Sequence, residues 1–360
     1  MKKVSTNDHF VISKVRCHSR YNISFFFRET LIFLFLLSNK YTIGRHDWLK
    51  AFYFDFLQCA IDPRKIDNLK KGSDTVWANL GAQQFHLPQG KPDAQVLEGQ
   101  IKLVVKDLQA FLDRYQTLVE SGSLQGSQFA LEAKSNEEGT SSLLVTDPWG
   151  SQFEIVEGDE TYRDLRGTQT GGEMTEAYAM TDLTFYTPMN CNLPGIARFY
   201  EQVLQAPTQL VPNSDDPDRV LVSVGPKQTL TFQRDPNGRS DVRHDDLRDD
   251  QVEAPEGFTS FLSNYGPHIS MYIADFCGTY RRADQMGVAY VNPRFKRRAY
   301  TMDEAIDDCM FRILDIVDPQ NPEDGVILKL EHEVRSVVKR DGSKYKSCPF
   351  DEIPDECIKN

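Results

Sequence analysis

One phrase occurs twice in this chain and constrains its fold more than any other feature. The segment "FYFDFLQC" begins at Phe52, and "FYEQVLQA" begins at Phe199, 147 residues later. In the second copy, apolar residues recur at i, i+3, i+4 and i+7 from Ile196, which is the spacing of one helix face. Strand-like segments flank this helix at 182–186, 219–225 and 228–234. The order predicts a repeated unit of one strand, one helix and further strands.

A second repeat fills the gaps between the copies of the first. "GQIKLVVKDL" from Gly99 matches "PHISMYIADF" from Pro267, 168 residues later, and each reads as a strand followed by a helix. The chain therefore reads as four βαβββ modules in two similar halves. Such modules cannot bury their apolar faces alone and must pair. We expect an α+β fold with a first domain over 1–157, a linker over 158–178, a second domain over 179–335 and a tail over 336–360.

Composition restricts the partners and the compartment. The net charge of -12 argues against a nucleic-acid partner, because binding phosphates requires a basic face. Apolar residues make up 40% of the chain and charged residues 26%, as in soluble globular proteins. The seven cysteines are scattered, and none form a Cys-x-x-Cys pair. This usage predicts reduced thiols and a cytoplasmic protein.

An apolar stretch near the N-terminus has two interpretations. Residues 23–37 are interrupted by Arg28 and Glu29 and are shorter than the roughly 20 apolar residues of a spanning helix. A membrane association is therefore not expected, although a signal anchor within 1–40 stays open. The alternative, which we prefer, is an insertion over 16–42 between a first strand at 7–15 and the helix at Phe52. The insertion would be a lid, a membrane-touching loop or a translated non-coding segment.

This organisation resembles the glyoxalase/bleomycin-resistance/extradiol-dioxygenase superfamily, also called the vicinal oxygen chelate proteins, over about residues 47–335. The most specific motif is "DPWGSQFEIVE" at 147–157, which is similar to the family's Asp-Pro-x-Gly-x-x-x-Glu closing strand. The resemblance implies four βαβββ modules paired into two glyoxalase-like open barrels. Each barrel would surround a cavity for a metal or a ligand.

The resemblance also implies candidate metal ligands, taken from the first and last strands of each module. Side chains alternate between the two faces of a strand, so the polar residues between apolar neighbours should face the cavity. The first barrel then offers His9, His86, Gln100 and Glu154. The second barrel offers Asp182, Thr231 or Thr229, His268 and Glu331, with Lys329 able to neutralise Glu331. The metal would be Fe, Zn, Ni or Mn, since such ligand sets suit several first-row ions.

Several functions stay open at this point. The first is a divalent-metal-dependent enzyme of lyase/isomerase or dioxygenase type, acting on a small oxygen-rich substrate, with Glu154 or Glu331 as the catalytic base. The alternative is a non-catalytic small-molecule-binding protein of the bleomycin-resistance type. A third is one active barrel beside one structural barrel. The Asp-rich segment 235–257 reads as a solvated loop. The substrate and the oligomeric state are not determined by the sequence.

Overall fold

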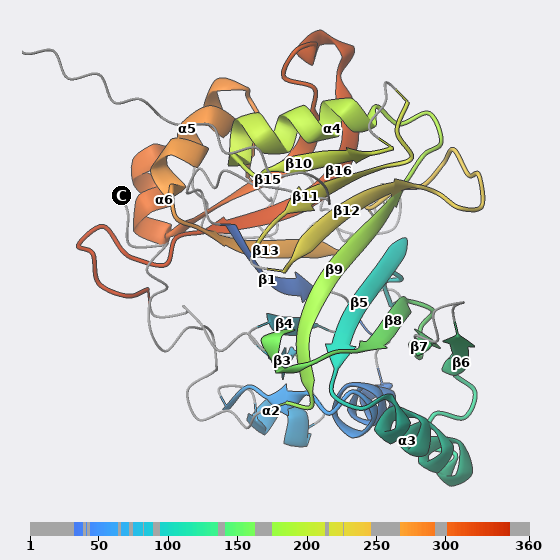
Figure 1. The fold of residues 1–360 in the computed structure, drawn as a ribbon. Coiled ribbons are helices and arrows are strands. Elements are labelled where there is room, and N and C mark those ends of the chain that lie inside the picture. The colour runs from blue at the N-terminus through green and yellow to red at the C-terminus, as the bar shows by residue number, and fades with distance from the viewer. Residues whose placement is uncertain are drawn as a thin grey trace, which may run out of the picture.

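The computed structural model shows the four predicted modules. It describes residues 32–38, 41, 44–63, 66–71, 75–81, 83–88, 94–135, 141–162, 175–212, 216–225, 227–245, 267–291 and 301–345. Within these ranges the order strand, helix, three strands occurs four times, as predicted (Figure 1).

The first half of the chain contains two modules. Module one consists of β1 (Ile32–Ser38), α1 (His46–Leu49) continuing into the π-helix η1 (Lys50–Phe56), β2 (Ala60–Ile61), α2 (Ile66–Lys71), β3 (Val76–Leu80) and β4 (Gln83–Leu87). Module two consists of β5 (Gly99–Val105), α3 (Leu108–Ser121), β6 (Ala130–Ser135), β7 (Ser141–Thr146) and β8 (Gln152–Glu157). The short 3₁₀ helix η3 (Glu160–Tyr162) follows.

The second half repeats this order. Module three consists of β9 (Ala177–Thr187), α4 (Leu193–Phe199) continuing into the π-helix η4 (Tyr200–Leu204), β10 (Thr208–Val211), β11 (Arg219–Ser223) and β12 (Thr229–Arg234). Module four consists of β13 (His268–Ile273), α5 (Phe276–Gln285), β14 (Ala289–Tyr290), α6 (Met302–Asp308), β15 (Met310–Val317), the 3₁₀ helix η5 (Pro322–Asp324) and β16 (Val326–Arg335).

The modules pair across the two halves, not within them. One eight-stranded sheet has the order β14-β15-β16-β13-β1-β4-β3-β2 and joins modules four and one; we call it the outer sheet. The other has the order β10-β11-β12-β9-β5-β8-β7-β6 and joins modules three and two; we call it the inner sheet. The prediction that each half forms its own barrel is therefore wrong. Sequence pattern within a strand does not say which of the four first strands will pair.

Two antiparallel ladders make these joints. β1 pairs with β13 in the outer sheet, and β5 pairs with β9 in the inner sheet. The long strands β5 and β9 lie side by side through the middle of the molecule (Figure 1). Each joint holds one strand from each half of the chain, so neither sheet is complete without both halves.

Strand β1 corrects the predicted insertion over 16–42. It lies at the centre of the outer sheet, paired antiparallel with β13 and parallel with β4. Position 35, within β1, precedes Phe52 by the same 17 residues that separate Asp182 from Phe199. The apolar run is thus the first strand of module one, at the same distance from the repeated phrase as the first strand of module three. The strand predicted at 7–15 lies outside the described residues.

The repeated phrase forms the end of a helix in both copies. Gln58 and Gln205 adopt the left-handed backbone conformation, with φ of 54° and 55°. In each copy the next amide donates back across the turn, from Cys59 N to the carbonyl of Tyr53 and from Ala206 N to that of Tyr200, both at 3.0 Å. The phrase recurs because it encodes the same helix stop twice.

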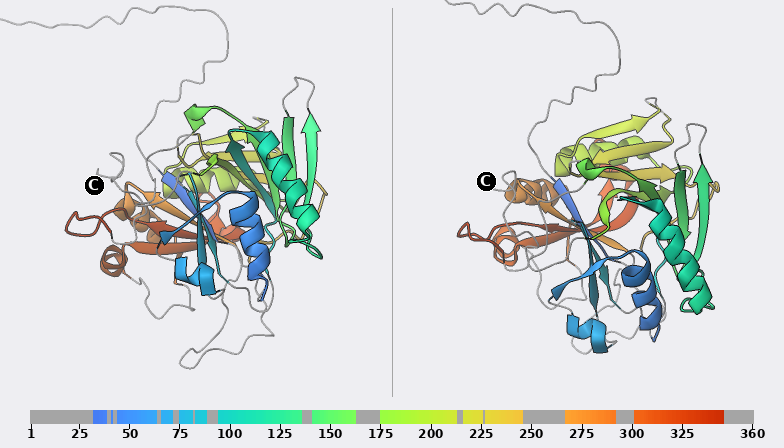
Figure 2. Two further views of the ribbon diagram at one scale, coloured as in Figure 1. Left: turned by 90° about the horizontal axis from the view of Figure 1, so that it is seen from below. Right: turned by 60° about the horizontal axis from the view of Figure 1, so that its bottom comes forward.

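The helices pack within each half. η1 and α3 lie alongside each other in both views of Figure 2. Arg114 of α3 donates from Nε to the carbonyl of Phe56, and Arg282 of α5 donates from Nε to the carbonyl of Val203, each at 2.8 Å. The two arginines are 168 residues apart, as are the repeats that contain them. The helix layers therefore follow the halves, while the sheets cross them.

Part of the predicted tail packs on module four. Val337 is buried, and Ser336 N donates to the carbonyl of Cys309 at 3.0 Å. Arg340 forms ion pairs with Asp303 and Asp307 of α6, each at 3.0 Å. In the part of the chain that the structure describes, no helix has the length and apolar character needed to cross a membrane.

Candidate functional site

Each sheet has one apolar and one polar face. In β13, the alternate residues Ile269, Met271 and Ile273 belong to the hydrophobic core, as the alternation predicts. His268 directly precedes these residues, Tyr272 lies between Met271 and Ile273, and both are outside that core cluster. We call the face that carries His268 the polar face of the outer sheet, and its counterpart with Lys102 and Asp182 the polar face of the inner sheet.

The outer sheet brings together two histidines that lie far apart in the sequence. The rings of His86 on β4 and His268 on β13 have centroids 6.1 Å apart and meet edge to face. Only β1 separates their strands, and its residue Ser38 is the register partner of both. Trp77 on β3 extends the group, with its ring 5.9 Å from that of His86. Both imidazoles are half-buried.

An arginine–glutamate cluster lies beside His268. Glu331 on β16 is the register partner of His268, and Glu333 follows on the same face. Arg312 of β15 forms ion pairs with both carboxylates, and Arg335 forms a further ion pair with Glu333. Burial raises the pKa of Glu333, but Arg312, Arg335 and His268 outweigh burial and hold it well below its usual range. The cluster is therefore ionised and internally neutralised.

The inner sheet carries a different arrangement on its polar face. Lys102 on β5 has Glu154 of β8 as its register partner on one side and Asp182 of β9 on the other. Lys102 Nζ lies 3.1 Å from Glu154 Oε2. Thr184 and Thr231 donate their hydroxyls to the two separate carboxylate oxygens of Asp182, each at 2.6 Å. Burial raises the pKa of Asp182, and the two hydroxyls and Lys102 partly offset this effect.

The two predicted ligand sets are each divided between the sheets. Of the first set, His86 lies on the outer sheet, whereas Gln100 and Glu154 lie on the inner sheet; His9 is outside the described residues. Of the second set, His268 and Glu331 lie on the outer sheet, whereas Asp182 and Thr231 lie on the inner sheet. The grouping failed because it assumed barrels within each half. Metal ligation by any of these residues stays a prediction.

Sequence reasoning did not select Glu333 as a site residue, although strand alternation puts it on the same face as Glu331, and it missed the arginines that bind it. The register pairs Glu333 with Ser270 as it pairs Glu154 with Lys102, and Ser270 stands 168 residues after Lys102. Glu333, and not Glu331, is therefore the repeat equivalent of Glu154. Arg312 had one available signal, because it interrupts the apolar strand "MFRILDIV". A charge in such a strand is expected to have a buried partner.

We tested whether these residues, as arranged, fit a divalent metal. Two imidazoles and a carboxylate are suitable donors for a first-row metal. On the outer sheet, however, Arg312 binds both carboxylates, and on the inner sheet Lys102 binds Glu154. Among the described residues, no three His, Cys, Asp or Glu side chains gather into a group that could hold a metal ion. The donor types suit a metal, but their arrangement does not fit one.

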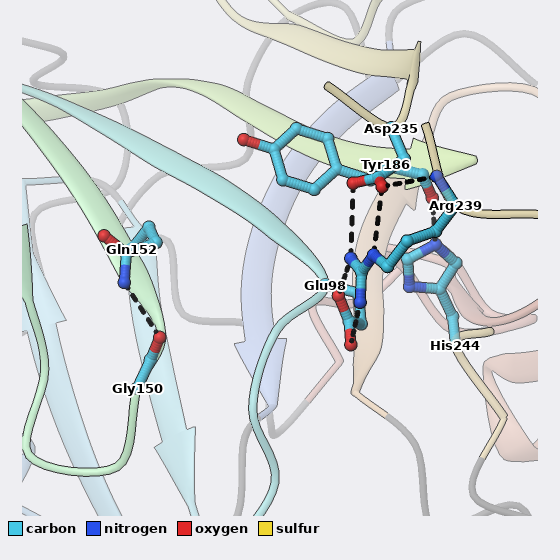
Figure 3. A network of polar contacts seen from close by, with 7 residues as sticks. All are labelled: Glu98, Gly150, Gln152, Tyr186, Asp235, Arg239 and His244. Carbon is cyan, nitrogen blue, oxygen red and sulfur yellow. Dashed lines mark hydrogen bonds and ion pairs between the residues drawn. The ribbon is translucent and has the colours of Figure 1, made fainter. Parts of the chain in front are cut away.

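A further polar network lies at one end of the inner sheet (Figure 3). Arg239 pairs with Glu98 at 2.6 Å and with Asp235 at 2.9 Å. His244 Nε2 lies 2.7 Å from the carbonyl of Tyr186, and its ring meets Phe185 edge to face. Asp235 and His244 are buried. The predicted solvated loop over 235–257 is thus anchored at its start, and residues 246–257 lie outside the described ranges.

Comparison with known proteins gives structural matches only. No family model matches the sequence, and no curated protein matches it. Glyoxalase I from Zea mays is 10% identical, with 85% of this chain and 92% of that chain covered and a TM-score of 0.45. A putative dioxygenase from Bacillus subtilis is 12% identical, with 84% of each chain covered and a TM-score of 0.47.

A shorter match comes from Sphaerobacter thermophilus. This member of the glyoxalase/bleomycin resistance protein/dioxygenase superfamily is 24% identical over 34% of this chain and 94% of its own, with a TM-score of 0.23. The strand order of the present structure identifies the architecture directly. With four βαβββ modules paired in two open eight-stranded sheets, the chain has the vicinal oxygen chelate fold.

Proposed function

We propose that the chain is a small-molecule-binding protein whose ligand, a small oxygen-rich molecule, sits on the polar face of the outer sheet. The observation that carries this proposal is the meeting of His86 and His268, with ring centroids 6.1 Å apart, beside a buried arginine–glutamate cluster. The two imidazoles belong to opposite halves of the chain. They meet only because the first and last modules share one sheet.

The chemistry of this face suits oxygen atoms. A neutral imidazole offers one N–H donor and one acceptor nitrogen, and a guanidinium offers only donors. Oxygens of a ligand accept hydrogen bonds from such groups. Arg312 and Arg335 are balanced by Glu331 and Glu333, so the cluster adds donors without adding net charge. A polar ligand of modest charge fits better than a strongly charged one.

Binding is favoured over proton-transfer catalysis by the state of the carboxylates. A general base needs a pKa near the operating pH. The pKa of Glu333 is held well below its usual range, chiefly by arginines that outweigh its burial. The predicted bases Glu154 and Glu331 are both in ion pairs, with Lys102 and Arg312. These carboxylates position neighbouring groups.

A metal-dependent enzyme is the second candidate, and the histidine pair is the observation in its favour. His86 and His268 would hold Fe, Zn, Ni or Mn, and a carboxylate would have to leave Arg312 to complete the set. A bound metal would supply Lewis-acid chemistry toward a small oxygen-rich substrate. The lyase/isomerase and dioxygenase types are not distinguished by these residues.

Thermal unfolding in the presence of a panel of 2-oxo acids, 2-hydroxy acids and catechols tests the proposal. We expect at least one compound to raise the unfolding temperature of the chelator-treated protein and to lose this effect in His86→Ala/His268→Ala. Gln100→Ala, on the other sheet, is the matched control and should keep the effect. Stabilisation that requires added metal would favour the second candidate. Equal stabilisation of the wild type and the double variant would contradict both.

A further inference from the structure

We propose that Lys102 takes the place of a metal ion on the inner sheet, so that this sheet carries a permanent cation that belongs to the chain itself. The proposal concerns the sheet opposite to the proposed ligand-binding face and does not depend on that function. The resemblance predicts Gln100, Glu154 and Asp182 as metal ligands. In the structure, Glu154 instead pairs with Lys102, and Asp182 accepts hydrogen bonds from two threonines.

The register places the ammonium group between two carboxylates. Lys102 is flanked by Glu154 on β8 and by Asp182 on β9. Its Nζ lies 3.1 Å from Glu154 Oε2, and its charge also lowers the pKa of Asp182. Adjacent strands lie about 4.8 Å apart, so all three side chains emerge from one rung of the sheet. Lys102 therefore faces both carboxylates from the strand between them.

Asp182 is also satisfied without a metal. Its two carboxylate oxygens accept hydrogen bonds from Thr184 and Thr231, each at 2.6 Å. The side chain is half-buried, and burial is the main cause of its raised pKa. A buried carboxylate normally needs hydrogen-bond donors or a counter-charge, and the inner sheet supplies both from its own strands.

The outer sheet reaches the same result with different residues. There the repeat places Ser270 at the position of Lys102, so no lysine faces Glu333 from β13. Arg312 of β15 and Arg335 of β16 neutralise Glu333 instead. In both sheets a basic side chain of the chain pairs with the carboxylate at this repeat position. Lys102 on the inner sheet and two arginines on the outer sheet therefore each neutralise the carboxylate at this position, Glu154 or Glu333, without an added ion.

Removal of the ammonium charge should uncover a metal site. Two carboxylates would then share one rung of the sheet, with Arg219 as the remaining positive charge that acts on Asp182, and like charges at such distances repel. A divalent cation would restore the balance, with Gln100, Glu154 and Asp182 as oxygen donors. We expect wild-type protein to take up no metal at this position, because the ammonium group already occupies the shared side of the carboxylates.

Isothermal titration of the full chain with MnCl₂ and with ZnCl₂ tests this proposal. All variants are made in the His86→Ala/His268→Ala background, which removes imidazole binding on the outer sheet. We expect Lys102→Met, which keeps the length and apolar stem, to bind one ion at least tenfold more tightly than the parent. Lys106→Met is the control, because it removes an equal charge from an exposed position at the end of β5.

Two further variants keep the result decisive. Lys102→Met/Glu154→Gln should lose the new site, and Lys102→Arg should never gain one. If Lys102→Met unfolds at low temperature, its thermal unfolding midpoint is measured with and without Mn²⁺. A rise of this midpoint on adding Mn²⁺, absent in Lys106→Met, supports the proposal. Equal metal binding by the parent and Lys102→Met, or a parent whose metal affinity falls on Glu154→Gln, would overturn it.

Discussion

At the scale of single residues, two buried histidines outside the polar faces contribute to the response to acid. His332 lies 2.6 Å from the hydroxyl of Tyr200, and His244 lies 2.7 Å from the carbonyl of Tyr186. Burial lowers the pKa of each to about 4. An unfolded histidine has a pKa of about 6.5, so below that pH the unfolded chain binds more protons than the folded one.

The contribution of these two histidines to the free energy of unfolding should therefore fall as the pH drops from about 6.5 toward about 4. Each histidine contributes at most about 1.4 kcal/mol per pH unit in that window. His332→Phe/Tyr200→Phe should show a shallower decline, because it removes one of the two titrating imidazoles. Phenylalanine is chosen because Phe153 holds the repeat position of His332. Urea unfolding at several pH values measures this, with Tyr200→Phe as the control. Parallel declines for the double variant and its control would contradict the assignment.

Asp147 shapes the "DPWG" turn through its backbone contacts. Its Oδ1 accepts from the amides of Trp149, Gly150 and Ser151 at 2.7–2.8 Å. Burial raises the pKa of Asp147 to about 6, against the lowering effect of these amides. Asp147→Asn keeps the acceptor and removes the buried charge, whereas Asp147→Ala leaves buried donors unpaired.

We expect Asp147→Ala to lower the free energy of unfolding by about 2 kcal/mol more than Asp147→Asn does. In the wild type, the raised pKa means that stability from this group is fully present below about pH 3.9 and is lost as the pH rises through about 6. Asp147→Asn should not show that loss. Chemical unfolding between pH 4 and 7 checks both expectations, and equal values for the two variants would refute them.

At the scale of elements, β1 shows what a sequence pattern can and cannot reveal. A strand in the middle of a sheet, with both faces covered, reads as a continuous apolar run without alternation. "IFLFLLS" is a continuous apolar run, whereas residues 7–15 alternate, so alternation favoured 7–15 as the first strand and left the apolar run as an insertion. Alternation worked where one face was polar, and it correctly put His86 and His268 on the face opposite to the core. The repeat also gave all four modules.

Sequence could not supply the grouping of these residues. Which histidine meets which carboxylate depends on which first strands pair, and the pattern within β1, β5, β9 and β13 does not specify their partners. The register then moved the repeat equivalent of Glu154 from Glu331 to Glu333. The strand order of the sheets determines these long-range contacts, and alternation within one strand contains no information about that order.

A proline in β1 tests its central position. Leu36 is the register partner of Ser270 on one side and of Gln84 on the other, so Leu36→Pro removes a ladder hydrogen bond in the middle of the outer sheet. We expect a loss of about 3 kcal/mol or more in the free energy of unfolding. The control is Ala133→Pro in the edge strand β6, where proline is better tolerated. A smaller loss in the free energy of unfolding for Leu36→Pro than for Ala133→Pro would contradict the central position of β1 and favour the insertion.

At the scale of the whole molecule, the two halves interlock. The sheets join modules from opposite halves, whereas Arg114 and Arg282 join helices within each half. Neither kind of contact alone would complete a core. In keeping with this arrangement, one hydrophobic core cluster contains residues from all four modules.

Separate expression of the halves should expose this dependence. Each fragment, 1–168 or 169–360, lacks four strands of the outer sheet and four strands of the inner sheet. We therefore expect neither fragment to be a cooperatively folded monomer. Mixed together, they should form a 1:1 complex, measured by light scattering during size-exclusion chromatography. A monomeric fragment with a sharp thermal transition would show that one half is self-sufficient.

The central claim is that the first module pairs with the last and the second with the third. Disulfide mapping tests it most directly, because antiparallel register partners have Cα atoms about 4.5–5.5 Å apart, within disulfide range. We predict spontaneous cross-links in Ser38→Cys/His268→Cys and in Gln100→Cys/Thr184→Cys, identified by mass spectrometry of unreduced peptides. The parent with its native cysteines is the control. A cross-link in Ser38→Cys/Gln100→Cys, with none in the two predicted pairs, would contradict the claim, because it would pair the modules within one half.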